Sequence, residues 1–396
     1  MIKVNSVVIA IWSISALTAL PGLAISPILG NLQTIFPQAG EMEIQMLTSL
    51  PSLLILPFIL LSGYLTQKVS VYKLLIGGLI IFGATGILYL LSTQMWQLIL
   101  VSAMLGIGAG IVIPLSTGLI SLFFAGKDRT KQFGLNSAIS NLTVVMATFF
   151  TGYLAGISWR LPFIVYLLPF IAIFLAVPLK KHWPVLNNNE DESMINESGI
   201  IIGKRGLDIK NLGNIMALYF TVTFSVVIFI FYVPFVISAN GLSDKLAGII
   251  ISVFFLAIMF PGLILNKITF IFGKQTILIS IFMVVIGLFT ISVAHGALIM
   301  VIAAFITGIG YGVIQPLCYD KTSYISKPNR NTIALACIMS MNYLAIVLCP
   351  IIIDSLKVLL YISGNIFPFR LGMSIALIVL SLALFKNKSF VFSVIK

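Results

Sequence analysis

The sequence is poor in charge and in the side chains that most enzymes use. Charged residues make up 9% of the 396 residues, whereas an average soluble domain holds about a quarter. There are two histidines, and no HExxH, CxxC or phosphate-binding loop. The three cysteines, Cys318, Cys337 and Cys349, lie in apolar runs, so we interpret them as packing residues. These absences exclude a soluble catalytic domain, and we expect neither a metal site nor a cofactor.

Apolar residues fill the chain instead. Hydrophobic residues make up 60% of the sequence, and its mean hydropathy is +1.14. Twelve runs reach about the 20 residues that a helix needs to cross a bilayer. The sequence therefore predicts an all-α polytopic membrane protein. The twelve predicted spans are residues 4–32, 44–66, 72–92, 96–124, 133–156, 161–179, 212–238, 246–265, 276–294, 298–324, 332–353 and 367–385.

One polar interruption divides these spans into six and six. Residues 181–210 hold a run of asparagines and acids, followed by the basic pair Lys204 and Arg205. This is the one stretch long enough to separate two halves. We therefore expect six-helix halves at residues 1–180 and 211–396, joined by a cytoplasmic linker at 181–210.

One pattern occurs in both halves, 202 residues apart. Residues 106–115 read Gly-Ile-Gly-Ala-Gly-Ile-Val-Ile-Pro-Leu, and residues 308–317 read Gly-Ile-Gly-Tyr-Gly-Val-Ile-Gln-Pro-Leu. Glycines let membrane helices approach closely, and proline is tolerated where neighbouring helices satisfy the freed backbone. Pseudo-symmetric halves with helices interrupted in matching places are typical of secondary transporters. The positions expected to act in packing or conformational change are Gly106, Gly110, Pro114, Gly308, Gly312 and Pro316.

Basic residues predict the orientation. With the amino terminus inside, 19 of the 23 lysines and arginines lie at cytoplasmic ends, and the exceptions are Arg160, Lys245, Lys357 and Arg370. This bias follows the positive-inside rule. It predicts a multi-pass protein with both termini cytoplasmic, in the cell membrane of a bacterial-type cell. The net charge of +12 then reports orientation and not nucleic-acid binding. The expected partners are a small-molecule substrate, protons and the lipid bilayer, and we expect a monomer.

The chain resembles the major facilitator superfamily over nearly its whole length. After its second span that family carries a motif that begins Gly-x-Leu and continues with an acid, a basic residue directly after it, and a second glycine. The matching residues here keep Gly63, Leu65 and a basic Lys68, with Gln67 in place of the acid. The resemblance implies two pseudo-symmetric six-helix halves and secondary transport by alternating access. It also implies a conformational role for Gly63 and Lys68.

Two signatures of the family's exporters are missing. The arginine that many proton-driven exporters carry before the first glycine of span four is Ser102 here. Of the Gly-Pro-x-x-Gly-Gly motif of span five, only Gly152 is kept. An exporter is therefore implied by general likeness to drug exporters and not by these motifs.

In the family's fold, spans one, four, seven and ten are expected to line a central cavity, with five and eleven close behind. Polar residues inside spans are costly in lipid, so they should face the bundle or the cavity. Span ten carries Tyr311, Gln315 and Tyr319 on one helical face, and Gln315 replaces Ile113 of the first repeat. We expect these three residues in the substrate site. The other candidates are Trp12, Ser137, Asn141, Thr221 and Ser225. Interhelical hydrogen bonding is the alternative role for such side chains.

The predicted cavity holds no lysine or arginine in the middle of spans one, four, seven or ten. An anionic substrate would need such a partner. The sequence therefore favours export of a hydrophobic or amphipathic, neutral or weakly cationic compound, driven by protons. One alternative is an importer or facilitator of a neutral metabolite. A second is a transport-inactive membrane receptor or assembly partner.

Proton coupling usually needs a carboxylate near the transport path. Asp320 is the acid that lies within a span expected to line the cavity. It falls about 100° around the helix from Tyr319, so it borders that face. The alternative role is a cytoplasmic gate or a helix-end ion pair, with Lys267 or Arg330 as the candidate partner.

Overall fold

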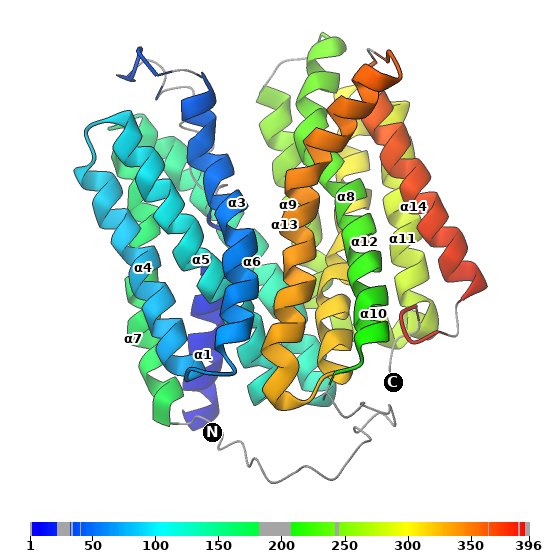
Figure 1. The fold of residues 1–396 in the computed structure, drawn as a ribbon. Coiled ribbons are helices and arrows are strands. Elements are labelled where there is room, and N and C mark those ends of the chain that lie inside the picture. Colours follow the sequence, from blue (N-terminus) through cyan, green and yellow to red (C-terminus); the bar gives the residue numbers. More distant parts are fainter. Residues whose placement is uncertain are drawn as a thin grey trace. The chain divides into compact units, whose positions relative to one another are not determined.

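The computed structural model describes residues 2–21, 32, 35–39, 41–181, 207–241, 245–362, 364–386 and 389–392. In these residues the regular structure is helical, apart from one antiparallel bridge between Leu207 and Ser326. The helices of the first part are α1 (Ile2–Leu17), α3 (Glu41–Leu65), α4 (Val71–Leu91), α5 (Met95–Phe123), α6 (Gly126–Ala155), η2 (Leu161–Leu167) and α7 (Leu168–Lys181). Those of the second part are α8 (Ile209–Ala239), α9 (Lys245–Leu263), α10 (Leu265–Phe272), η3 (Gly273–Gln275), α11 (Thr276–Ser292), α12 (Ala297–Tyr324), α13 (Pro328–Leu359) and α14 (Phe367–Phe385) (Figure 1).

The predicted all-α membrane fold is confirmed. Among the described residues, ten helical segments are long and apolar enough to cross a bilayer, and the two shorter apolar helices are Ser6–Leu17 and Gly248–Leu263. Together they account for the twelve predicted spans. Residues 22–31 of the first predicted span, and residues 182–206 of the predicted linker, lie outside the described residues.

Two helices start earlier than their apolar runs suggest. α6 begins at Gly126 and not at residue 133, and α13 begins at Pro328 and not at residue 332. The first turns of both helices are polar, so hydropathy alone assigns them to loops. Several side chains of these turns, such as Lys127, Asp128 and Arg330, are exposed, so the turns extend each helix beyond its apolar part.

Contacts divide the chain into two compact units, with α6 and α13 divided between them. Unit 1 comprises Met1–Phe124, Ile139–Asp191 and Pro328–Ser340, and unit 2 comprises Ala125–Ala138, Glu192–Lys327 and Met341–Lys396. The first turns of α6 thus belong to unit 2, and the first turns of α13 belong to unit 1. The boundaries predicted from the sequence, at 1–180, 181–210 and 211–396, stay a prediction.

The repeated glycines make matching contacts in the two units. A Cβ atom on Gly106 would lie 2.7 Å from a carbonyl oxygen of α3, and one on Gly308 would lie 2.6 Å from a carbonyl oxygen of α9. Gly110 and Gly312, one turn further on, face the same two neighbouring helices. The repeated prolines lie inside α5 and α12. A larger side chain at these glycines would push the packed helices apart.

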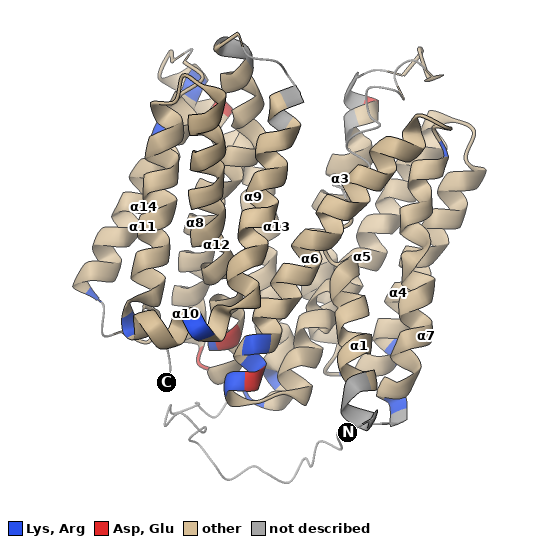
Figure 2. Ribbon diagram, turned by 180° about the vertical axis from the view of Figure 1, so that it is seen from behind, with Lys and Arg blue, Asp and Glu red and all other residues tan. Residues whose placement is uncertain are grey.

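Charged side chains lie at the helix ends. In each unit, most of the described lysines and arginines lie at the end nearer to that unit's chain terminus (Figure 2). This distribution is the one that the positive-inside rule predicts. The side of the membrane that each end faces stays a prediction.

Candidate functional site

The predicted residues of span ten meet a tyrosine of α8 inside unit 2. The side-chain amide of Gln315 donates from Nε2 to the hydroxyl of Tyr219 at 3.2 Å and to the hydroxyl of Tyr319 at 3.3 Å. The hydroxyls of Tyr219 and Tyr319 lie 3.1 Å apart. Tyr311 donates its hydroxyl to that of Tyr219 at 3.3 Å. The three predicted residues therefore share one hydrogen-bond network, which we call the tyrosine cluster.

Tyr219 is the centre of this cluster, and sequence reasoning missed it. Its side chain is fully buried. Its ring stacks on Tyr311 with centroids 6.5 Å apart and meets Tyr319 edge-on at 5.8 Å. A phenol hydroxyl has one donor and two acceptor positions. Because Tyr311 and Gln315 fill the acceptor positions of Tyr219, its own proton is donated to Tyr319.

Two further hydroxyls extend the cluster. Ser137, from the first turns of α6, donates to Oε1 of Gln315 at 3.1 Å. On α8, the hydroxyls of Thr223 and Tyr311 lie 3.1 Å apart. Phe133 of α6 meets the ring of Tyr319 edge-on, with centroids 6.2 Å apart. The structure thus brings four predicted residues together and adds Tyr219 and Thr223.

The signal for these two additions was present in the sequence. Tyr219 and Thr223 are four residues apart, the same spacing as the span-ten residues. The sequence interpretation instead followed Thr221 and Ser225, which lie on another face of α8. In the structure both of those hydroxyls bond to carbonyls of their own helix. Their role in substrate binding stays a prediction.

The remaining two candidates belong to unit 1. Trp12 lies in α1, and Asn141 lies in the part of α6 that packs in unit 1. Both side chains are partly buried. Their substrate roles also stay predictions.

Asp320 forms a buried ion pair near the end of α12. Its Oδ1 lies 3.0 Å from Nε of Arg129, and both side chains are about nine-tenths buried. Thr130 donates its hydroxyl to Oδ2 of Asp320 at 2.6 Å. The guanidinium of Arg129 also lies 4.1 Å from the ring centroid of Tyr324, one turn further along α12. Asp320 is therefore held from two sides by the first turns of α6.

This partner differs from the candidates named from the sequence. Arg129 takes the place that we assigned to Lys267 or Arg330. The reason is the early start of α6, which places Arg129 on a helix that the apolar run did not include. A second nitrogen of Arg129, Nη2, is buried and has no hydrogen-bond partner among the described residues.

The repeat shows that this ion pair has an uncharged counterpart in unit 1. Asp320 lies 202 residues after Gly118, and Thr332 lies 202 residues after Thr130. A Cβ atom on Gly118 would lie 2.8 Å from the hydroxyl oxygen of Thr332. Glycine therefore meets threonine in unit 1, where aspartate meets threonine in unit 2.

The loop after α3 also contacts the first turns of α13, within unit 1. Arg330 donates from Nη1 to Oε1 of Gln67 at 3.0 Å, at an exposed position. Gly63 allows a close approach, because a Cβ atom there would lie 2.7 Å from the Cβ of Ala336. Lys68 lies over an aromatic ring of α3, with Nζ 4.8 Å from the centroid. Gln67, which stands in place of the family's acid, is uncharged and accepts a hydrogen bond from the Arg330 cation.

Ser102, which stands in place of the exporter arginine, is buried between two helices of unit 1. Its hydroxyl lies 2.6 Å from that of Tyr89 on α4 and donates to the carbonyl of Leu98 at 2.9 Å. This position therefore links α5 to α4.

Comparison with known proteins identifies the family. The family model described as Major Facilitator Superfamily matches residues 6–350. The chain belongs to the Major Facilitator Superfamily. It is a multi-pass membrane transporter and not an enzyme, as the transporters that share its fold also indicate.

Two curated relatives are bacterial proteins named for drug resistance or drug transport. The quinolone resistance protein NorA of Staphylococcus aureus is 30% identical over 115 residues, which cover 29% of this chain and 29% of NorA. The multidrug transporter protein MdtP of Bacillus subtilis is 27% identical over 158 residues, which cover 40% of this chain and 28% of MdtP. The chain thus matches less than a third of the length of these relatives.

Solved structures of the superfamily share the whole fold. The proton:xylose symporter XylE aligns with a TM-score of 0.75 and 15% identity, covering 97% of this chain and 96% of XylE. The human organic anion transporter MFSD10 (TETRAN) aligns with a TM-score of 0.74 and 11% identity, covering 96% and 99%. At these identities the likeness concerns the fold alone.

Proposed function

We propose that this superfamily member exports hydrophobic or amphipathic, neutral or weakly cationic small molecules across the cell membrane, driven by the proton gradient. The observation that carries the proposal is the tyrosine cluster. It offers aromatic faces, one amide and several hydroxyls, with no formal charge. Small-molecule sites combine apolar and aromatic walls with a few polar groups of this kind. The partial matches to NorA and MdtP support the same substrate class.

The cluster has one donor to offer a substrate. The hydroxyl of Tyr319 accepts hydrogen bonds from Tyr219 and Gln315, and its own proton has no acceptor among the described residues. A substrate with a carbonyl, ether or amine acceptor would take that proton. Tyrosine faces would hold a planar apolar body, and they attract a weakly cationic one.

Alternating access would expose the cluster by moving the first turns of α6. Ser137 and Arg129 both belong to those turns, and they contact Gln315 and Asp320 of α12. We propose that both contacts break together when the transporter changes state, because rigid elements switch between discrete packings. Since Asp320 is held by Arg129 and Thr130, the ion pair favours a role as a gate over a role as the coupling acid.

Transport into inverted membrane vesicles tests the proposal. Vesicles that contain the protein are energised to an acidic interior, and uptake of ethidium and of a fluoroquinolone is followed. Uptake that requires the protein and collapses with a protonophore is the expected result. Accumulation in right-side-out vesicles alone would indicate an importer. No protein-dependent flux of a broad compound panel in either type of vesicle would favour the transport-inactive receptor.

A further inference from the structure

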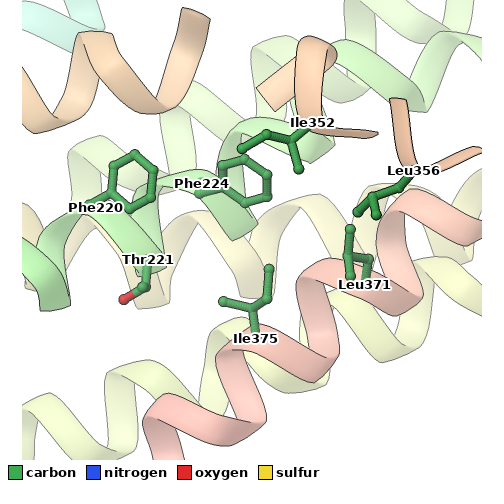
Figure 3. A pocket seen from close by; sticks show the side chains of 7 residues that line it. All are labelled: Phe220, Thr221, Phe224, Ile352, Leu356, Leu371 and Ile375. Atoms are coloured by element: carbon green, nitrogen blue, oxygen red, sulfur yellow. The ribbon is translucent and has the colours of Figure 1, made fainter. Parts of the chain in front are cut away.

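Unit 2 has an apolar groove between α8, α13 and α14 (Figure 3). Its residues on α8 lie on a different helical face from Tyr219 and Thr223 of the tyrosine cluster. The groove encloses about 180 Å³. Its apolar lining residues are Phe220 and Phe224 of α8, Ile352 and Leu356 of α13, and Leu371 and Ile375 of α14. The remaining lining residue, Thr221, donates its hydroxyl to two carbonyls of its own helix, at 2.8 and 3.0 Å. The groove therefore offers a ligand hydrocarbon contacts alone.

The groove lies near one end of α13 and of α14. Thr221 lies near the middle of α8, whereas Leu356 is in the last turn of α13 and Leu371 is in the second turn of α14. α13 and α14 diverge from the turn that joins them (Figure 1). On each of the three helices the lining residues lie within about one turn, so the groove holds a segment of a chain about 6 Å deep along each helix. A segment of a lipid acyl chain is pure hydrocarbon, which matches the chemistry of this lining.

Two basic side chains belong to the same end. Lys357 and Arg370 are each the chain neighbour of a lining residue. Arg370 is exposed, and its guanidinium has no hydrogen-bond or ion-pair partner among the described residues. Lys357 lies with Nζ 5.1 Å from the ring centroid of Tyr232. Asp354, an acid near the same end of α13, accepts a hydrogen bond from Tyr232 at 3.0 Å.

Basic residues are scarce on this side of the membrane. In the predicted orientation four of the 23 lysines and arginines are external, and two of those four are Lys357 and Arg370. The positive-inside rule does not account for this pair. A lipid phosphate does, because guanidinium and ammonium groups bind it with charge-assisted hydrogen bonds. We propose that the groove holds one acyl chain of an anionic phospholipid, whose phosphate binds Lys357 and Arg370.

Lipid retention by the purified full-length protein tests this site. The protein in mild detergent is equilibrated with phosphatidylglycerol or with phosphatidylcholine of the same chain length, and bound lipid is counted by native mass spectrometry. The double variant K357Q/R370Q should retain at least tenfold less phosphatidylglycerol than the unmodified protein. The variant I375F, which fills the groove, should show a similar loss. The conservative pair K357R/R370K should retain the lipid.

A matched control removes two exposed bases of unit 2 that do not neighbour a lining residue of the groove. Lys274 lies in η3, and Lys386 follows the last residue of α14. K274Q/K386Q should retain phosphatidylglycerol as the unmodified protein does. An equal loss in this control, or equal retention of phosphatidylcholine by the unmodified protein, would overturn the proposal. So would an I375F variant that keeps its lipid but loses transport, since the groove would then belong to the substrate path.

Discussion

The first turns of α6 pack in unit 2 and the first turns of α13 pack in unit 1, at places that the 202-residue repeat makes equivalent. In unit 2, Thr130 of α6 meets a carboxylate, and Arg129 beside it completes a buried ion pair. In unit 1, Thr332 of α13 meets Gly118, and no charge takes part in that contact. The crossing of α6 and α12 in unit 2 is thus stabilised by an ion pair. The equivalent crossing of α13 and α5 in unit 1 is made by close packing.

This difference predicts different responses to change. Removing one partner of a buried ion pair leaves an uncompensated charge, which typically costs about 3–5 kcal/mol. A contact made by close packing involves no charged group, so its stability depends on the volume of the side chains that meet. The α6 crossing should therefore release as one cooperative step, whereas the α13 crossing should tolerate every substitution that preserves size.

The largest effect is expected at the ion pair. Asp320→Asn leaves the Arg129 cation buried without its counter-charge and should destabilise this state by about 3–5 kcal/mol. If Asp320 acts as a gate, both gradient-driven transport and substrate exchange should fail in reconstituted vesicles. If it couples protons, exchange should persist while accumulation is lost. Normal gradient-driven transport would remove Asp320 from both roles.

The two equivalent threonines offer a matched pair. Thr130→Val removes a hydrogen bond to a charged group and should lower stability by about 1.5–3 kcal/mol. Thr332→Val keeps the shape of the side chain and removes no hydrogen bond to an ion, so its effect should be much smaller. Thermal unfolding in detergent measures both. Equal destabilisation by the two variants would mean that the charge does not distinguish the two crossings.

The repeat also differs at Gln315, where unit 1 has Ile113. Gln315→Ile makes α12 resemble α5 and leaves Ser137 and Tyr219 without their amide partner. Transport or substrate range should change several-fold while membrane expression stays near normal, and Tyr311→Ala should act in the same way. The reverse change, Ile113→Gln, serves as the control for a polar group at the matching place. Unaltered transport kinetics in both α12 variants would exclude Tyr311, Gln315 and Tyr319 from the substrate site.

The smallest effect is expected where charge is added to the α13 crossing. Gln67→Asp restores the family's acid opposite Arg330, but the pair is exposed. Exposed ion pairs contribute little, so the transport rate should change by less than about fivefold. The change should also shrink at high salt. A larger effect that also shrinks at high salt would show that the unit 1 crossing depends on charge after all.

Much of the fold could be predicted because its signals are local. Apolar runs predicted the spans, and the glycine and proline pattern predicted the matched packing of α5 and α12. The start of α6 could not be predicted in this way, since its first turns are polar and their partner, Asp320, lies 191 residues from Arg129.

The residues of the candidate site on α12 could be predicted from the sequence, but those on α8 could not. Four-residue spacing gathered Tyr311, Gln315 and Tyr319 correctly onto one face of α12. The same spacing could not show which face of α8 meets α12, because α8 carries polar residues on more than one face. Tyr219 was missed for that reason. Only the packed structure shows that this face, and not the face of Thr221, meets α12.

A charge exchange across the ion pair tests the central claim most directly. Gradient-driven efflux into inverted vesicles is measured for Arg129→Asp, for Asp320→Arg and for the double variant. If the crossing of α6 and α12 is held by charge, each single variant should lose most of the transport and the double variant should recover a substantial part. Single variants that transport normally, or a well-expressed double variant no better than the singles, would contradict the account.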